Sequence, residues 1–140
     1  MDVAKLLSAL ENEDNSSLLE LDLKKISAIK NDILQKLNMS REILKDFNKK
    51  LKKYRYVEDL SEIKFGSYIR WIPLKDPTNI KLTNGGFICD VKVLDAGIHI
   101  LCRNGFNRIF QLSMDENLIF QKLNDEEMIL LKTLDHLEDL

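Results

Sequence analysis

Five short apolar runs between Ser67 and Leu123 constrain the fold more than any other feature of the chain. They cover residues 68–72, 87–93, 98–102, 108–114 and 118–123. The longest gap between them, 73–86, holds both prolines and the turn cluster Thr83-Asn84-Gly85-Gly86, so it predicts a long polar loop. Runs of this length bounded by turn residues are typical of strands. The segment therefore predicts one small, closed or half-closed β-barrel.

The second run alternates apolar and polar residues, which predicts one face in the core and one face in water. Its predicted core face consists of Phe87, Cys89, Val91 and Val93. Phe110, on the fourth run, alternates with aliphatic residues and is also expected in the core. Cys89 and Cys102 lie on adjacent predicted strands, and we expect both to be free thiols that act as small hydrophobic side chains there, with a disulfide between them as the less favoured alternative.

The spacing of the turns distinguishes between two kinds of five-stranded barrel. An OB-fold needs room for a helix between its third and fourth strands, whereas this chain has only the Asn104-Gly105 turn there. A long loop after the first strand, three tight turns and a short connector before the last strand resemble the layout of SH3-like and Tudor-like barrels. The resemblance covers residues 67–123, concerns the order of elements, and implies binding of a peptide or of nucleic acid.

A 3-4 spacing of apolar residues before the barrel predicts helices. It runs through Leu19, Leu23, Ile26, Lys30, Ile33, Leu37, Ser40, Leu44, Phe47, Leu51 and Tyr54. A repeat sustained for this length is typical of a coiled coil or of a long helical hairpin, and both alternatives stay open. For self-association we expect contacts through the apolar members of this seam: Leu19, Leu23, Ile26, Ile33, Leu37, Leu44, Phe47 and Leu51.

Three features of the seam bear on that choice. Ile29, Leu34 and Ile43 widen the apolar stripe, as in a helix packed in a bundle. The segment 38–42 contains cap-type residues at which the helix can break. Lys30 interrupts the seam, and its ammonium must reach water or find a partner.

A helix is also predicted after the barrel. Asn124 and Glu127 have the spacing of a capping box, and Leu130, Leu131, Leu134 and Leu137 line one side of the segment that follows. The chain is thus predicted to belong to the α+β class, with a helical segment in residues 1–57 and an SH3-like barrel with its C-terminal helix in residues 58–140.

Charge is segregated along the chain although the formal net charge is only −2. Residues 23–114 hold 18 basic and nine acidic residues, whereas both ends are acidic. The sharpest basic run is Lys49, Lys50, Lys52, Lys53 and Arg55. A solvated helix face is the favoured interpretation, since the whole chain is not strongly basic, and contact with a polyanion is the alternative.

Aromatic residues of the barrel offer a second candidate surface. Tyr68, Trp71 and Phe106 form the candidate partner-binding set, because binding a cation or a base needs several exposed rings that converge. The usual burial of tryptophan nevertheless favours a core position for such residues. Arg70, Arg103 and Arg108 stand opposite the apolar alternation and predict an outer basic face that contacts phosphates better than it distinguishes bases.

The sequence contains no motif typical of catalysis or of cofactor binding. His99 lies in an apolar run and His136 near a charged helix end, and neither has a nucleophile or carboxylate at a recognisable spacing. No zinc spacing, P-loop or dinucleotide-binding motif occurs. We therefore expect no enzyme activity, metal, cofactor or small-molecule substrate. With no membrane-length apolar run and only two cysteines, a soluble protein in the reducing cytoplasm is expected.

Three blocks of the β-segment carry a further resemblance: Gly66-Ser67-Tyr68-Ile69-Arg70-Trp71-Ile72-Pro73-Leu74, Leu82-Thr83-Asn84-Gly85-Gly86-Phe87-Ile88 and residues 114–123. With the abundance of Lys, Asn and Ile, they resemble uncharacterised proteins of large cytoplasmic DNA viruses. The resemblance implies a virion or host-cytoplasm setting and assigns no functional residue.

The sequence as a whole favours a non-enzymatic adaptor or structural protein. Its helices would self-associate or dock, and its barrel would bind a protein partner. The alternative is a nucleic-acid-associated factor that uses the basic run and the outer arginines of the barrel.

Overall fold

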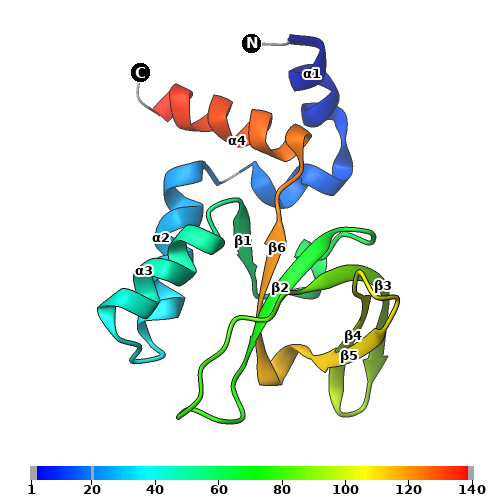
Figure 1. Cartoon of the computed structure of the whole chain (residues 1–140). Coiled ribbons are helices and arrows are strands. Elements are labelled where there is room, and N and C mark those ends of the chain that lie inside the picture. Colours follow the sequence, from blue (N-terminus) through cyan, green and yellow to red (C-terminus); the bar gives the residue numbers. More distant parts are fainter. Residues whose placement is uncertain (1–2, 20, 139–140) are drawn as a thin grey trace.

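The computed structural model describes residues 3–19 and 21–138, apart from the side chain of Ser17, and has four α-helices and one six-stranded sheet in this part of the chain (Figure 1). The helices are α1 (Val3–Glu11), α2 (Leu23–Gln35), α3 (Arg41–Lys50) and α4 (Asp125–Glu138). The strands are β1 (Tyr54–Val57), β2 (Tyr68–Pro73), β3 (Gly86–Leu94), β4 (Gly97–Arg103), β5 (Ile109–Ser113) and β6 (Asn117–Lys122). Short 3-10 helices are η1 (Glu13–Leu18), η2 (Leu60–Glu62) and η3 (Met114–Glu116). The predicted α+β class is confirmed.

The sheet is antiparallel and open, with strand order β1-β6-β2-β3-β4-β5. All five predicted runs are strands, and β1 is a sixth that the sequence did not predict. In the described residues, no ladder joins the two edge strands β1 and β5, so the sheet is not a closed barrel. Val57 of β1 and Leu112 of β5 nevertheless pack in one buried cluster with Trp71 and Ile100, which places the two edges of the sheet round a common core.

A β-bulge in β3 changes the face that each of its side chains occupies. The register shifts between Ile88 and Asp90, so Cys89 has no direct partner on β4. Ile88 and Val91 therefore both pack in the core, whereas Phe87 and Cys89 are exposed. Val93 lies on the same face as Val91 but is exposed near the end of the strand. The prediction of an uninterrupted core face on this strand was wrong, because simple alternation does not allow for an inserted residue.

The helical seam of residues 19–54 is broken into two helices followed by a strand. Asn38 has a positive φ of 54°, and the Ser40 side chain accepts a hydrogen bond from the Ile43 backbone N–H at 3.3 Å to begin α3. Asn48 of α3 donates to Asn31 of α2 at 3.1 Å, which joins the two helices. No continuous coiled coil therefore runs from residue 19 to residue 54.

Most residues predicted for self-association are used inside the monomer. Ile26, Phe47 and Leu51 are buried. Leu23, Ile33, Leu37 and Leu44 are half-buried, and Leu19 is exposed. Self-association through the helices stays a prediction, and it would use the exposed edge of the seam.

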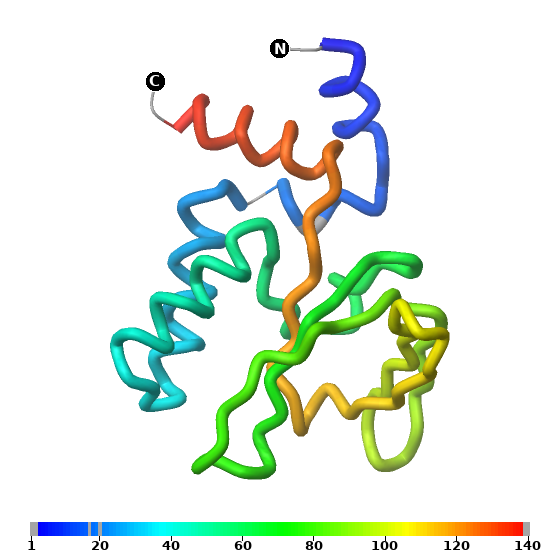
Figure 2. The backbone as a smooth tube through the Cα atoms, in the orientation of Figure 1, coloured from blue at the N-terminus to red at the C-terminus, as the bar shows by residue number. Residues whose placement is uncertain are grey.

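Strand β6 has packing partners on both of its faces. Leu118 and Phe120 face α2 and α3, where they contact the cluster that contains Leu34, Phe47 and Leu51. Ile119 faces the cluster enclosed by the curved sheet. After β6 the chain passes directly into α4, which packs on α1 through a third cluster containing Ala9, Leu18, Leu130 and Leu131 (Figure 2). The hydrophobic clusters therefore contain residues from both sides of the predicted domain boundary at residue 57.

None of the helices in the described part of the chain combines the length and the apolar character that crossing a bilayer requires.

Candidate partner-binding groove

A groove of about 1070 Å³ lies where η1, the segment 61–67 and the first residues of β2 and β3 meet the end of β6 and the start of α4. We call it the aromatic groove, after the side chains of one wall. Its lining residues are Asn12, Glu13, Asp14, Ser16, Tyr54, Ser61, Ile63, Lys64, Phe65, Gly66, Ser67, Tyr68, Phe87, Lys122, Leu123, Asn124 and Asp125.

The aromatic wall is built from adjacent strands and the segment before them. Tyr68 of β2 and Phe87 of β3 are directly paired, and their rings meet edge to face with centroids 5.0 Å apart. Phe87 is 54% exposed, and Phe65 is 68% exposed. Two large apolar side chains left open to water beside a concave surface are typical of an interaction site.

Gly85 allows the loop after β2 to lie against this wall. Its φ is +93°, and a Cβ atom there would stand 2.2 Å from the Ile69 backbone oxygen and 2.9 Å from the Tyr68 ring. The Tyr68 hydroxyl donates a hydrogen bond to the backbone oxygen of the neighbouring Asn84. The ring is thereby fixed at the groove wall.

The exposed wall continues sideways across the outer face of the sheet. Tyr68 pairs with Phe87, Phe87 with Arg103, and Arg103 with Ile109. Directly paired residues of antiparallel strands share a face, so these four side chains form one row across β2, β3, β4 and β5. Phe87, Arg103 and Ile109 are all exposed. The row extends the apolar surface of the groove and places one cation within it.

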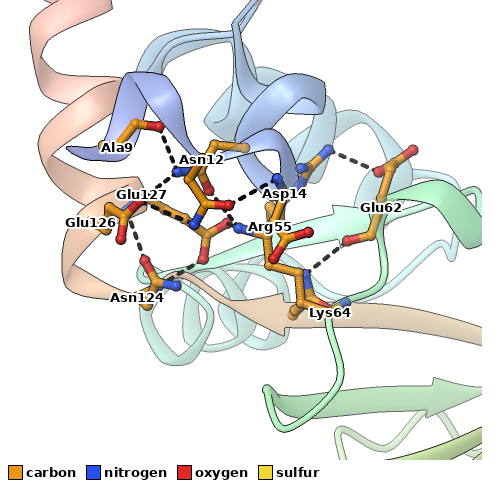
Figure 3. Close-up of polar contacts among 11 residues, drawn as sticks. Ala9, Asn12, Asp14, Arg55, Glu62, Lys64, Asn124, Glu126 and Glu127 are labelled. Atoms are coloured by element: carbon orange, nitrogen blue, oxygen red, sulfur yellow. Dashed lines mark hydrogen bonds and ion pairs between the residues drawn. The ribbon is translucent and has the colours of Figure 1, made fainter. Parts of the chain in front are cut away.

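The polar floor of the groove depends on the Lys64 ammonium (Figure 3). Its Nζ donates to Asn15 Oδ1 at 2.6 Å and lies 3.2 Å from Glu127 Oε2. The Asn15 amide donates in turn to the Ala9 backbone oxygen at 2.9 Å and to Glu126 at 3.0 Å. Asn15 and Glu127 are buried, so Lys64 joins η1 to α4 in a site where polar groups need partners.

A second set of bonds holds the segment that carries Phe65. The Gln121 side chain accepts from the Lys64 backbone N–H at 2.9 Å and donates to the Glu62 backbone oxygen at 3.0 Å. The Arg55 guanidinium and the Glu62 carboxylate form an ion pair at 2.8 Å, largely shielded from water. Burial lowers the pKa of Arg55, and nearby Glu62 opposes that effect. These bonds fix the backbone on both sides of the groove.

The start of α4 is capped as predicted. The Asn124 side chain accepts from the Glu127 backbone N–H at 2.8 Å, and Glu127 accepts from the Asn124 N–H at 3.0 Å. Glu127 thus caps the helix and also pairs with Lys64. Leu130 and Leu131 are fully buried, whereas Leu137 is exposed.

The lining of the aromatic groove carries more negative than positive charge. Glu13, Asp14 and Asp125 line it, and the charge of Lys64 is balanced by Glu127. Lys122 is the other lysine among the lining residues. The groove therefore combines an aromatic wall with an electronegative opening, which suits a ligand carrying apolar and cationic groups.

The predicted aromatic set is divided by the structure. Tyr68 lines the groove, and Phe106 is 89% exposed in the turn after β4. Trp71 is only 8% exposed and packs in the core, so its assignment to a binding surface was wrong. Its ring centroid lies 6.2 Å from that of Phe110, which is 38% exposed. Trp71 is buried because the curved sheet encloses this face of β2.

The predicted arginines also differ in their surroundings. Arg103 and Arg108 are exposed, as expected of an outer basic face. Arg70 is half-buried and donates from Nε to the Thr83 backbone oxygen at 2.8 Å, so it holds the long loop against β2. Sequence reasoning missed Phe65 and assigned Phe87 and the exposed Phe110 to the core. The Lys64-Phe65-Gly66 turn gave no periodic signal.

The predicted polyanion run does not form one face. Lys49 and Lys50 end α3, and Lys50 pairs with Asp46 at 2.9 Å. Lys52 and Lys53 occupy the turn that follows. Arg55 is 6% exposed and bound to Glu62, so its assignment as a polyanion contact was wrong.

No cluster of three or more histidine, cysteine, aspartate and glutamate side chains in the described part of the chain could hold a metal ion. His99 Nδ1 lies 3.2 Å from the Gln111 amide nitrogen across neighbouring strands. Comparisons of the chain with models of known protein families, with curated proteins and with solved structures found no significant match.

Proposed function

We propose that this protein is an interaction module that binds an extended segment of a protein partner in the aromatic groove. The observation that carries the proposal is the exposure of Phe65 and Phe87 beside an electronegative opening. The expected segment has apolar side chains for the aromatic wall and a lysine or arginine for Glu13, Asp14 or Asp125. Burying the two phenylalanines would contribute roughly 1.5–3 kcal/mol each before the costs of association.

The rigidity of the groove supports this function. Lys64, Gln121 and Glu127 tie together the elements on which its walls stand. A groove held by buried bonds loses little conformational entropy on binding, so more of the contact energy remains as affinity.

We further propose that β2 to β6 are related to SH3-like barrels. The order of these five strands, the long loop after β2 and the short η3 before β6 support the relationship. The open edge between β1 and β5 is a departure from the closed form of such barrels. The proposal for the groove depends on its own residues and not on this relationship.

The groove is tested by selecting ligands from a random-peptide library displayed on phage. We expect enriched peptides that contain aromatic or aliphatic residues together with lysine or arginine. The F87A variant should weaken their binding by roughly tenfold or more, because it removes a central apolar contact. V93A is the matched control, since Val93 is also an exposed apolar residue of β3 but does not line the groove.

Two results would contradict the proposal. One is the absence of any enriched peptide. The other is enrichment of peptides that bind wild type, F87A and V93A with equal affinity, which would place the binding surface elsewhere. Chemical-shift mapping on the labelled protein gives an independent location, and changes are expected at Phe65, Tyr68 and Phe87.

A further inference from the structure

A second groove, of about 990 Å³, lies between α2, the α3–β1 turn and α4. We call it the lysine groove. Its lining residues are Leu23, Lys24, Ile26, Ser27, Ala28, Lys30, Asn31, Asn48, Lys52, Lys53, Leu123, Met128 and Lys132. Five of them are lysines and none is acidic, which separates this groove from the electronegative aromatic groove.

Three of the five lysines bring positive charge to the groove that no carboxylate among the described residues balances. Lys52, Lys53 and Lys132 form no ion pair with a carboxylate in the part of the chain that the structure describes. These lysines come from two elements, the α3–β1 turn and α4, and line one concave surface. Like charges gathered round a depression repel one another and attract an anion into it.

The fifth lysine, Lys30, is buried beneath the turn that carries two of the others. It is 4% exposed, and its Nζ donates to the Leu51 backbone oxygen at 2.7 Å and to the Tyr54 backbone oxygen at 3.0 Å. It therefore brings a further positive charge to the groove and is bound only to neutral acceptors in the described residues. Burial lowers the pKa of Lys30, and an anion in the groove would offset that effect.

The same bonds make the basic turn rigid. Lys30 holds its two ends at Leu51 and Tyr54, and the Leu123 backbone N–H donates to the Lys53 backbone oxygen at 2.8 Å. Lys52 and Lys53 thus project from a backbone fixed on two sides. A fixed backbone reduces the entropy lost when these side chains order round a ligand.

Amide groups supply neutral polar partners at the groove wall. Asn48 donates to Asn31 Oδ1 at 3.1 Å, which leaves the Asn31 amide hydrogens available as further donors. Ammonium groups with a neighbouring amide are the donors that bind clustered phosphate oxygens in proteins.

We propose that the lysine groove binds a compact, multiply charged phosphate anion, such as an oligophosphate chain. A compact anion fits better than an extended nucleic acid because the lysines converge on one depression and do not follow a line along the surface. This site is separate from the aromatic groove, and its function does not depend on peptide binding.

The test is calorimetric titration of the purified chain with tripolyphosphate, compared among charge variants. K52Q/K53Q should weaken binding by roughly tenfold or more, because two charge-assisted contacts are lost. K49Q/K50Q is the matched control: it removes the same charge from the end of α3, yet neither residue lines the groove. The affinity of K49Q/K50Q for tripolyphosphate should stay within about twofold of that of the wild type.

A variant of Lys132 tests whether phosphate binding needs the whole lysine groove or only the turn that carries Lys52 and Lys53. Lys132 stands on α4, on another wall, so K132Q should weaken binding by roughly tenfold as well. Equal losses in K49Q/K50Q and K52Q/K53Q would show diffuse surface attraction and overturn the proposal. Unchanged binding in K132Q would also overturn it.

A second arm of the experiment uses a single-stranded DNA oligonucleotide at physiological salt. Tripolyphosphate binding with no comparable DNA binding supports the compact-anion site. DNA binding that depends on Lys52 and Lys53 and falls steeply with salt, together with absent tripolyphosphate binding, would overturn the compact-anion assignment in favour of a nucleic-acid interface.

Discussion

Lys30 shows how one buried charge makes stability depend on pH. Its pKa is lowered in the folded protein because burial disfavours the charged ammonium. Between the folded pKa and the ordinary value of 10.5, the unfolded chain binds more protons than the folded one. The free energy of unfolding therefore rises with pH in that interval, by about 1.4 kcal/mol for each unit of pKa lowering.

The comparison with K30M isolates this effect. We expect the unfolding free energy of the wild type, minus that of K30M, to increase as the pH is raised from 7 to about 10. Tyr54, Tyr56 and Cys102 have raised pKa values, but they are present in both proteins and their titration largely cancels. Urea denaturation at several pH values gives the measurement. A difference that stays constant would contradict the prediction.

The basic run after Asn48 shows that residues close together in the sequence need not share one surface in the fold. Five cationic residues stand close together in the chain, but a helix end, a turn and a strand carry them in different directions. Arg55 is drawn inside because β1 places it against Glu62. Lys30 was correctly recognised as a residue that needs a partner, whereas its partners, two backbone oxygens more than 20 residues away, had no sequence signal.

At the scale of elements, the bulge in β3 separates the two thiols of the protein. Cys89 is exposed and Cys102 is buried, and burial raises the pKa of Cys102 to about 11. We expect the Cys89 thiol to react rapidly with an aromatic disulfide reagent in the native protein. The Cys102 thiol should react only on unfolding. The rapid phase should vanish in C89S and persist in C102S. Similar rates for both thiols would refute the bulged register.

Local signals predicted the elements that depend on local bonds. The capping box of α4, the break near Asn38 and the five central strands are all encoded in short stretches of sequence. β1 was not predicted, because it follows the basic helix end directly and continues its 3-4 spacing. Its identity as a strand depends on pairing with β6, which lies about 65 residues further along the chain.

The aromatic groove could be predicted only in part, for the same reason. Tyr68 was identified from its aromatic character. Phe65 and Phe87 were not, since the exposure of Phe65 depends on a turn fixed by Gln121, and that of Phe87 depends on the bulge. The acidic opening comes from η1 and α4, which are far apart in sequence and are joined through Lys64.

At the scale of the whole molecule, the shared clusters predict one cooperative unfolding transition. α1 packs on α4, and α2 and α3 pack on β6, so the helices and the sheet cannot lose their cores independently. The fluorescence of Trp71, which is buried in the sheet, and the far-ultraviolet circular dichroism of the helices should change with the same urea midpoint. Separate midpoints would show that residues 1–57 and 58–140 are independent folding units.

The position of β6 has a consequence for the newly made protein. β1 is paired with β6 alone, and α1 packs on α4, so the first half of the described chain finds these partners only in its last quarter. During synthesis, the apolar faces of α1, α2 and α3 lack these packing partners until Leu118, Phe120 and Leu130 have left the ribosome. Such long-range pairing slows folding and leaves the nascent chain open to aggregation or to chaperones until residues 118–130 have been synthesised.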